Sequence, residues 1–160
     1  MTHVVGVPGL KVSANPGDTL ITYALGSCLG VAAYDPVAGV GGLLHVMLPS
    51  SALAPEKAGR EPCMFVDTGV PLLFRECCRA GARKERLVVK VAGGAGFRED
   101  GGTDPFQVGK RNFAAVRQLL RREGVLLCAQ DVGGAQPRTM LLEIGTGRVI
   151  VRVGGEERIL

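Results

Sequence analysis

The chain has 160 residues, a hydrophobic content of 46% and a net charge of +4. This length suits one domain with a substantial core, so we expect a single domain over residues 1–160. The charge is mild and no basic stripe with interleaved aromatic residues is present, which argues against a nucleic-acid partner. No signal peptide or apolar run of membrane length is visible. Five cysteines are an odd number, which argues against a framework of disulfide bonds. We therefore expect a reduced, cytoplasmic protein without membrane insertion.

The first half of the chain predicts short strands separated by turns. Apolar and β-branched runs favour strands, while Asn15-Pro16-Gly17-Asp18 favours a turn because proline fixes φ and asparagine and glycine tolerate tight bends. The predicted strands cover residues 4–13, 19–23, 29–34 and 43–48.

A loop and a helix follow these strands. Residues 50–61 are polar, with one proline and a glycine, and predict a mobile loop. A helix is expected to begin near Asp67 or Pro71 and to run to about Ala80, with its apolar residues at helical spacing on one face. Pro71 suits the first turn of a helix better than its interior.

The second half predicts one long helix among further strands. Residues 110–123 carry an apolar stripe opposite several arginines, and Gly124 is a natural residue to end the helix. Gly145-Thr146-Gly147 predicts a hairpin turn between the last two strands. The predicted strands cover residues 87–92, 125–130, 138–143 and 148–153.

The number and order of these elements indicate the fold class. About eight short strands and two helices occur without regular alternation of strand and helix, which argues against a doubly wound fold. Each helix has a single apolar stripe. We therefore expect an α+β layered fold, a mixed β-sandwich with its two main helices packed on one sheet face.

Cys28 and His45 are the candidate catalytic residues. Cys28 follows Gly26 and Ser27 between two apolar runs, and the strand that carries His45 is expected to lie beside it. A thiol nucleophile needs a nearby imidazole and main-chain N–H groups for the developing oxyanion, here those around Ser27 and Cys28. The pattern alone still favours the alternative of a buried apolar cysteine and a core histidine.

A third group usually orients the imidazole of such a pair. The Thr22 hydroxyl is one candidate, although an ordinary strand threonine is the more frequent case. Asp35 is near in sequence, but Asp35-Pro36 resembles a turn.

Other chemistry finds little support. No spacing typical of a zinc site is present, and the glycine-rich segments match neither a phosphate loop nor a dinucleotide fingerprint. We expect no metal and no cofactor. The remaining cysteines are scattered and are interpreted as packing or surface residues: Cys63, Cys77, Cys78 and Cys128.

Several segments in order resemble the chemoreceptor glutamine deamidase family CheD. They cover nearly the whole chain and include TYALGSCLGV at 22–31, GGLLHVMLP at 41–49, KVAGGAGF at 90–97 and VGKRNFAAVR at 108–117. The resemblance implies a layered α+β sandwich similar to the catalytic domain of cytotoxic necrotizing factors.

The resemblance also implies an activity and a site. The family's nucleophile falls on Cys28, its general base on His45 and its orienting threonine on Thr22. The expected reaction converts glutamines of methyl-accepting chemotaxis receptors to glutamate, through a Cys28 thioester and without a cofactor. A CheC-type phosphatase is an expected partner. Two other hypotheses remain open: a non-catalytic adaptor that docks such a phosphatase or a receptor, and a redox sensor that oxidises Cys28.

Overall fold

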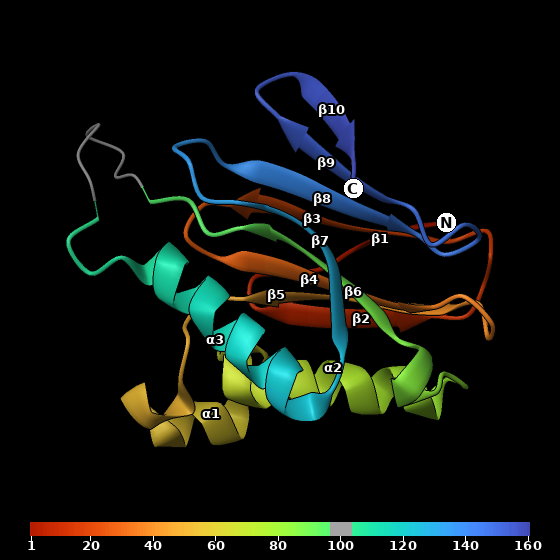
Figure 1. Ribbon diagram of the computed structural model, residues 1–160, viewed down its shortest axis with the longest axis horizontal. Coiled ribbons are helices and arrows are strands. Elements are labelled where there is room, and N and C mark those ends of the chain that lie inside the picture. The colour runs from red at the N-terminus through yellow and green to blue at the C-terminus, as the bar shows by residue number, and fades with distance from the viewer. Residues whose placement is uncertain (97–103) are drawn as a thin grey trace.

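Two five-stranded β-sheets stacked face to face form the body of the protein (Figure 1). The computed structural model describes residues 1–96 and 104–160. Sheet A has the order β1 (Thr2–Val4), β3 (Thr19–Leu25), β8 (Arg138–Glu143), β9 (Val149–Val153) and β10 (Glu156–Ile159). Sheet B has the order β2 (Gly9–Ser13), β5 (Val40–Val46), β4 (Leu29–Asp35), β6 (Val88–Gly93) and β7 (Leu126–Val132).

Both sheets combine parallel and antiparallel pairing. The pairs β1–β3 and β6–β7 are parallel, and the other pairs are antiparallel. Three of the antiparallel pairs, β4–β5, β8–β9 and β9–β10, are joined by short turns, which antiparallel pairing permits. The expectation of a layered, mixed β-sandwich of the α+β class is confirmed.

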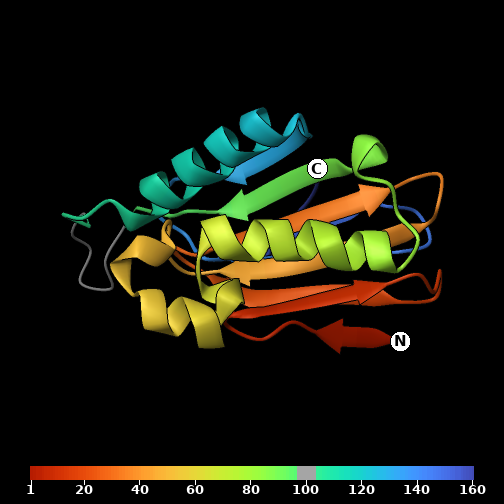
Figure 2. The ribbon, with the colours of Figure 1, turned by 90° about the horizontal axis from the view of Figure 1, so that it is seen from below.

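The two main helices cover the outer face of sheet B (Figure 2). They are α2 (Val66–Arg79) and α3 (Val108–Glu123). Val70 of α2 and Val116 of α3 are buried in one apolar cluster with Leu44 of β5. This arrangement confirms the prediction that both helices lie on one sheet face. Gly124, with φ of 68°, ends α3 as predicted.

Strand β5 is buried along its whole length, and this position determines where His45 points. Leu44 and Val46 belong to the core beneath the helices, whereas Leu43 belongs to the core between the sheets. Successive side chains of a strand alternate between faces. His45 therefore faces sheet A, inside the sandwich.

The prediction of one strand over residues 4–13 is wrong. The segment divides into β1, which pairs in sheet A, and β2, which pairs in sheet B. Gly6-Val7-Pro8 separates them, because proline lacks the N–H that a strand ladder needs. The chain crosses between the two sheets at this point.

The prediction of a mobile loop over residues 50–61 is also wrong. The segment contains a short 3-10 helix at Ser51–Leu53 and the helix α1 (Pro55–Arg60). The Ser51 backbone N–H and hydroxyl donate to the Asp67 carboxylate, at 2.8 and 2.6 Å. A contact with a residue distant in sequence therefore holds the segment in place, and the local sequence pattern does not predict this contact.

Two details of the helices and strands differ from expectation. Pro71 lies inside α2, which begins at Val66, so it does not occupy the first turn. Packing of the apolar face of α2 on sheet B compensates for the hydrogen bond that a proline removes. Strand β10 was not predicted; it follows Gly154 and Gly155, both with positive φ, in a turn that closes a hairpin with β9.

Candidate active site

Cys28 lies at a bend between the two sheets. Strand β3 has an irregularity after Thr22, Ala24 adopts a positive φ of 57°, and the chain then enters sheet B at Leu29. Cys28 is half-buried and packs against the core between the sheets. The bend therefore presents the thiol to the inter-sheet space, with a partly open side.

The two glycines on either side of Cys28, Gly26 and Gly30, have different structural roles. The positive φ of the bend belongs to Ala24, and a Cβ on Gly26 would meet nothing within 4 Å. Gly26 therefore borders open space, two residues before the thiol. A Cβ on Gly30, in contrast, would lie 2.6 Å from the Met140 sulfur. Gly30 is required because the sheets approach closely there.

His45 lies beside this bend, on the neighbouring strand. It is fully buried, and in the strand register it is opposite Gly30 of β4 and Gly9 of β2. Side chains at opposite positions share a face of the sheet, so neither neighbour crowds the imidazole. Burial lowers the pKa of His45 to about 4. The ring is therefore neutral at pH 7.

Thr22 fixes the orientation of this ring. Its Oγ1 lies 2.7 Å from His45 Nδ1 and 3.0 Å from the Val5 carbonyl oxygen. A hydroxyl has one proton, and a carbonyl oxygen can only accept. The hydroxyl therefore donates to Val5 and accepts from the Nδ1–H group. This assignment leaves the lone pair of the neutral ring on Nε2.

The Nε2 atom is buried, and it has no hydrogen-bond partner within residues 1–96 and 104–160. Cys28 and His45 share the inter-sheet face of adjacent strands, but no hydrogen bond joins them in the described structure. Burial raises the pKa of the Cys28 thiol, although its own N–H partly opposes this effect. Both groups are thus neutral at rest. Asp35 pairs with Arg86 and does not contact His45.

Three hydrogen bonds hold the carbonyl groups of the bend. Ala95 N–H donates to Gly26 O at 2.8 Å, and Gly94 N–H donates to Cys28 O at 2.9 Å. The Asn112 side-chain amide donates to Ser27 O at 3.0 Å. The C=O and the N–H of a trans peptide point in opposite directions, so the Ser27 and Cys28 N–H groups point away from these donors. Neither group donates to a carbonyl in the part of the chain that the structure describes.

Asn112 is a site residue that the sequence did not reveal. It is fully buried on α3, and its amide also donates to Met47 O at 3.0 Å, two residues beyond His45. One side chain thus connects both candidate catalytic segments to α3. A signal existed in the sequence, because Asn112 shares the apolar face of the helix with Val116 and Leu119. A polar residue on such a face requires buried partners.

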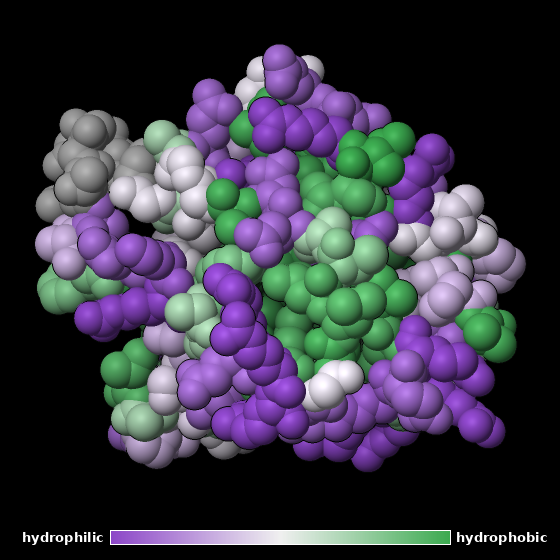
Figure 3. Space-filling view, in the orientation of Figure 1, coloured by the Kyte–Doolittle hydropathy of each residue, from purple (hydrophilic) through white to green (hydrophobic). Residues whose placement is uncertain are grey.

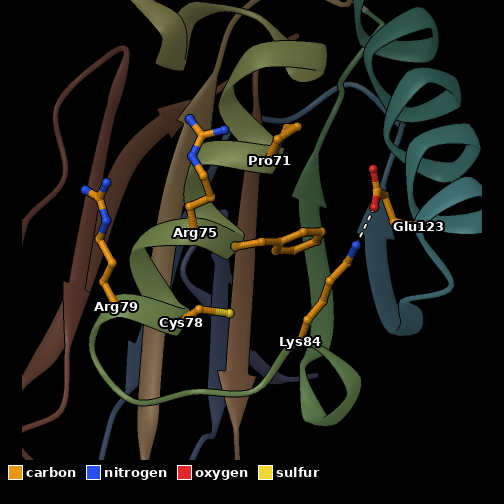
Figure 4. A pocket seen from close by; sticks show the side chains of 7 residues that line it. Pro71, Arg75, Cys78, Arg79, Lys84 and Glu123 are labelled. Carbon is orange, nitrogen blue, oxygen red and sulfur yellow. Dashed lines mark hydrogen bonds and ion pairs between the residues drawn. The ribbon is translucent and has the colours of Figure 1, made fainter.

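A large groove lies elsewhere on the described surface. It has a volume of about 510 Å³ between α2 and α3, and Figure 4 shows the Lys84–Glu123 ion pair at its edge. Neither Cys28 nor His45 lines it. Cys78 is exposed at this groove, whereas Cys77 lies on the buried face of α2. Of the remaining cysteines, Cys63 packs against the core beneath the helices and Cys128 is exposed.

A thiol and an oriented, neutral imidazole that face the same space between two β-sheets are the groups that thiol-dependent hydrolysis requires. A family model described as CheD chemotactic sensory transduction matches residues 47–153. The chain belongs to this CheD family. The matched region begins after Thr22, Cys28 and His45, so it does not itself bear on these three residues.

Curated relatives extend the similarity to nearly the whole chain. A protein of Syntrophus aciditrophicus, named "Probable chemoreceptor glutamine deamidase CheD 1", is 48% identical over 95% of this chain and 94% of its own length. The "Chemoreceptor glutamine deamidase CheD" of Thermotoga maritima is 41% identical over 99% of this chain and 97% of its own. A solved Neisseria meningitidis structure reaches only a TM-score of 0.41 at 13% identity, over 79% of this chain and 52% of its own, which is too weak to bear on fold or function.

None of the helices in the described residues is long and apolar enough to cross a membrane.

Proposed function

We propose that this protein is a cysteine-dependent protein-glutamine deamidase, which converts specific glutamines of methyl-accepting chemotaxis receptors to glutamate and releases ammonia. The observation that carries the proposal is the double contact of Thr22, which leaves the His45 Nε2 lone pair unpartnered on the face that Cys28 shares. The names of the relatives support the substrate, since several are called chemoreceptor glutamine deamidases.

His45 acts as the general base for Cys28. The Nε2 lone pair takes the thiol proton while the sulfur attacks the Cδ carbon of the glutamine carboxamide. The pKa of the thiol is raised and that of the imidazole is lowered to about 4. Proton transfer is therefore unfavourable in the free protein. The thiolate forms together with the attack rather than as a standing ion pair.

The N–H groups of Ser27 and Cys28 stabilise the oxyanion of the tetrahedral intermediate. Their direction follows from the hydrogen bonds that hold the Gly26 and Ser27 carbonyls. Donors fixed before the reaction cost no reorganisation when the charge develops, and the loss of one costs about 3–4 kcal/mol in comparable sites. Asn112 is a positioning residue in this mechanism, because it holds the Ser27 peptide without touching the substrate.

The intermediate then collapses with departure of the nitrogen. Protonated His45 donates its Nε2 proton to the leaving group, the C–N bond breaks, and ammonia leaves a thioester on Cys28. Water enters on the side left open by Gly26 and gives its proton to His45 as it attacks the thioester. The C–S bond breaks, the thiol regains its proton, and the product carboxylate adds one negative charge to the receptor.

The test is mass spectrometry of a recombinant chemoreceptor cytoplasmic fragment incubated with this protein. We expect the mass change of glutamine to glutamate at defined positions, with ammonia released in equal amount. The Cys28→Ala variant should give neither product. Tight binding of the fragment without any mass change in the wild type would support the adaptor hypothesis instead. Peroxide-dependent binding without amide hydrolysis would support the redox sensor.

Two finer expectations stay predictions. A CheC-type phosphatase partner follows from the family resemblance, and co-elution of the two purified proteins tests it. The cytoplasmic location follows from cysteine usage, and cell fractionation tests it.

A further inference from the structure

Helix α3 carries the net charge of the whole chain. Its exposed cationic residues outnumber its one acidic residue, Glu123, by four, which equals the formal net charge of +4. The rest of the chain is therefore neutral. In Figure 3, hydrophilic side chains cover the outer face of α3. The cationic residues are Lys110, Arg111, Arg117, Arg121 and Arg122.

These cations differ from most other arginines in lacking acidic partners. Within the described ranges, no ion pair includes any of the five; Arg117 instead lies over the Phe113 ring, 5.7 Å from its centroid. Elsewhere, arginines pair closely with carboxylates, as in Arg86–Asp35 at 2.9 Å and Arg148–Glu143 at 3.0 Å. The described residues thus leave a positive potential on the face of α3.

Three of the cations form a line that begins at the candidate active site. Lys110, Arg117 and Arg121 follow the spacing i, i+7 and i+11, which places them on one side of a helix over roughly 16 Å. We call these three residues the α3 stripe. Lys110, the first residue of the stripe, lies between Gly109 and Asn112. An added Cβ on Gly109 would lie 2.5 Å from Gly94 O, and Asn112 donates to Ser27 O. The stripe therefore leads directly away from the Cys28 bend.

We propose that the α3 stripe docks an acidic α-helix of the chemoreceptor substrate while a glutamine of that receptor occupies the Cys28 site. This inference rests on the proposed function. A helix lying alongside α3 repeats its side chains at the same spacing, so its carboxylates match the cations in register. Charged contacts of this kind favour encounter and orientation and leave the chemical step unchanged.

A membrane surface fits this face less well. Interfacial helices insert large apolar side chains beside their cations. Among the residues that the structure describes, two exposed large apolar side chains flank α3: Phe106 just before it, and Leu126, which lines a hollow with Arg117 and Arg121. They lie near opposite ends of the helix, and none lies within it, so they form no continuous apolar face along α3. An acidic protein helix needs no such anchor.

The test compares two variants that lose the same charge. The stripe variant is Lys110→Gln/Arg117→Gln/Arg121→Gln. The control is Lys11→Gln/Lys57→Gln/Arg60→Gln, which removes three exposed cations that have no ion partner in the described ranges. With a receptor cytoplasmic fragment as substrate, we expect the stripe variant to raise KM about tenfold or more, because three charged contacts are lost together. Its kcat and the alkylation rate of Cys28 should match those of the control.

A binding experiment separates this inference from the proposed function. In the Cys28→Ala background, calorimetry with the same fragment should show weaker binding for the stripe variant than for the control, even if no deamidation is found. Equal KM and equal affinity in the two variants would overturn the inference. So would stripe-dependent binding to phosphatidylglycerol vesicles together with unchanged affinity for the receptor fragment.

Discussion

Two cysteines buried to different degrees show what makes a thiol useful. Cys77 lies on the buried face of α2 against β5, where an added Cβ on Gly42 would sit 3.0 Å from its sulfur, and burial raises its pKa to about 12. Burial also raises the pKa of Cys28, but this thiol is only half-buried and shares a face with the His45 lone pair. Burial alone makes a thiol inert. Access and a correctly oriented base distinguish Cys28.

Replacing the two cysteines tests this comparison with the largest expected effect. Cys28→Ala should lower deamidation by about 10⁴-fold or more, because the nucleophile is lost. Cys77→Ala should keep the rate within a factor of about two and lower the free energy of unfolding by about 1–2 kcal/mol through loss of packing. Rates come from receptor mass spectrometry and stabilities from urea unfolding. A large loss of rate in Cys77→Ala at unchanged stability would contradict the distinction.

Removing the base should have the next largest effect. His45→Gln keeps a polar side chain but removes the proton acceptor, so kcat should fall by about 10²–10⁴-fold. The variant should also lose a pH dependence of stability. Between pH 6.5 and 4 the unfolded chain binds a proton at His45 that the folded chain, with a pKa of about 4, does not, so folding stability falls as pH falls. Urea unfolding across this range should show a smaller decrease in His45→Gln than in the wild type.

Loosening the bend should have a smaller effect. Asn112→Ala removes the donor to Ser27 O and Met47 O. We expect kcat to fall about tenfold to a hundredfold with little change in KM, and stability to fall by about 1–3 kcal/mol. The control is Gln118→Ala, at an exposed position of the same helix. A loss of stability with a normal kcat would show that Asn112 supports only the fold.

Releasing the imidazole should have the smallest effect of the four. Thr22→Val keeps the shape of the side chain but loses the acceptor for His45 Nδ1–H, and kcat should fall about tenfold. Thr22→Ser retains the hydroxyl and should stay close to the wild type. Equal rates for the valine and serine variants would argue against an orienting role of Thr22.

The sequence anticipated the arrangement of the site better than the contacts that hold it. Alternating and helical patterns placed most strands and both main helices, because periodicity reports which face is buried. The split of residues 4–13 between two sheets and the helices within 50–61 depend on distant partners, such as Asp67 for Ser51. The pairing of Thr22 with His45 joins different sheets; spacing alone made Thr22 one candidate among others, and the family resemblance singled it out. The place of Asn112 on the apolar face of α3 indicated burial, but its partners are main-chain atoms, which residue spacing in the sequence cannot identify.

Alkylation of the five cysteines as a function of pH, read by peptide mapping in the wild type and in His45→Gln, tests the central claim most directly. The account predicts that iodoacetamide labels Cys28 ahead of Cys77. The labelling rate of Cys28 should keep rising as pH increases past the ordinary thiol pKa of 9.0, and it should show no step near pH 6.5. The rate should fall strongly in His45→Gln. Labelling of Cys28 that is unchanged in His45→Gln, or preferential labelling of Cys63, would contradict it.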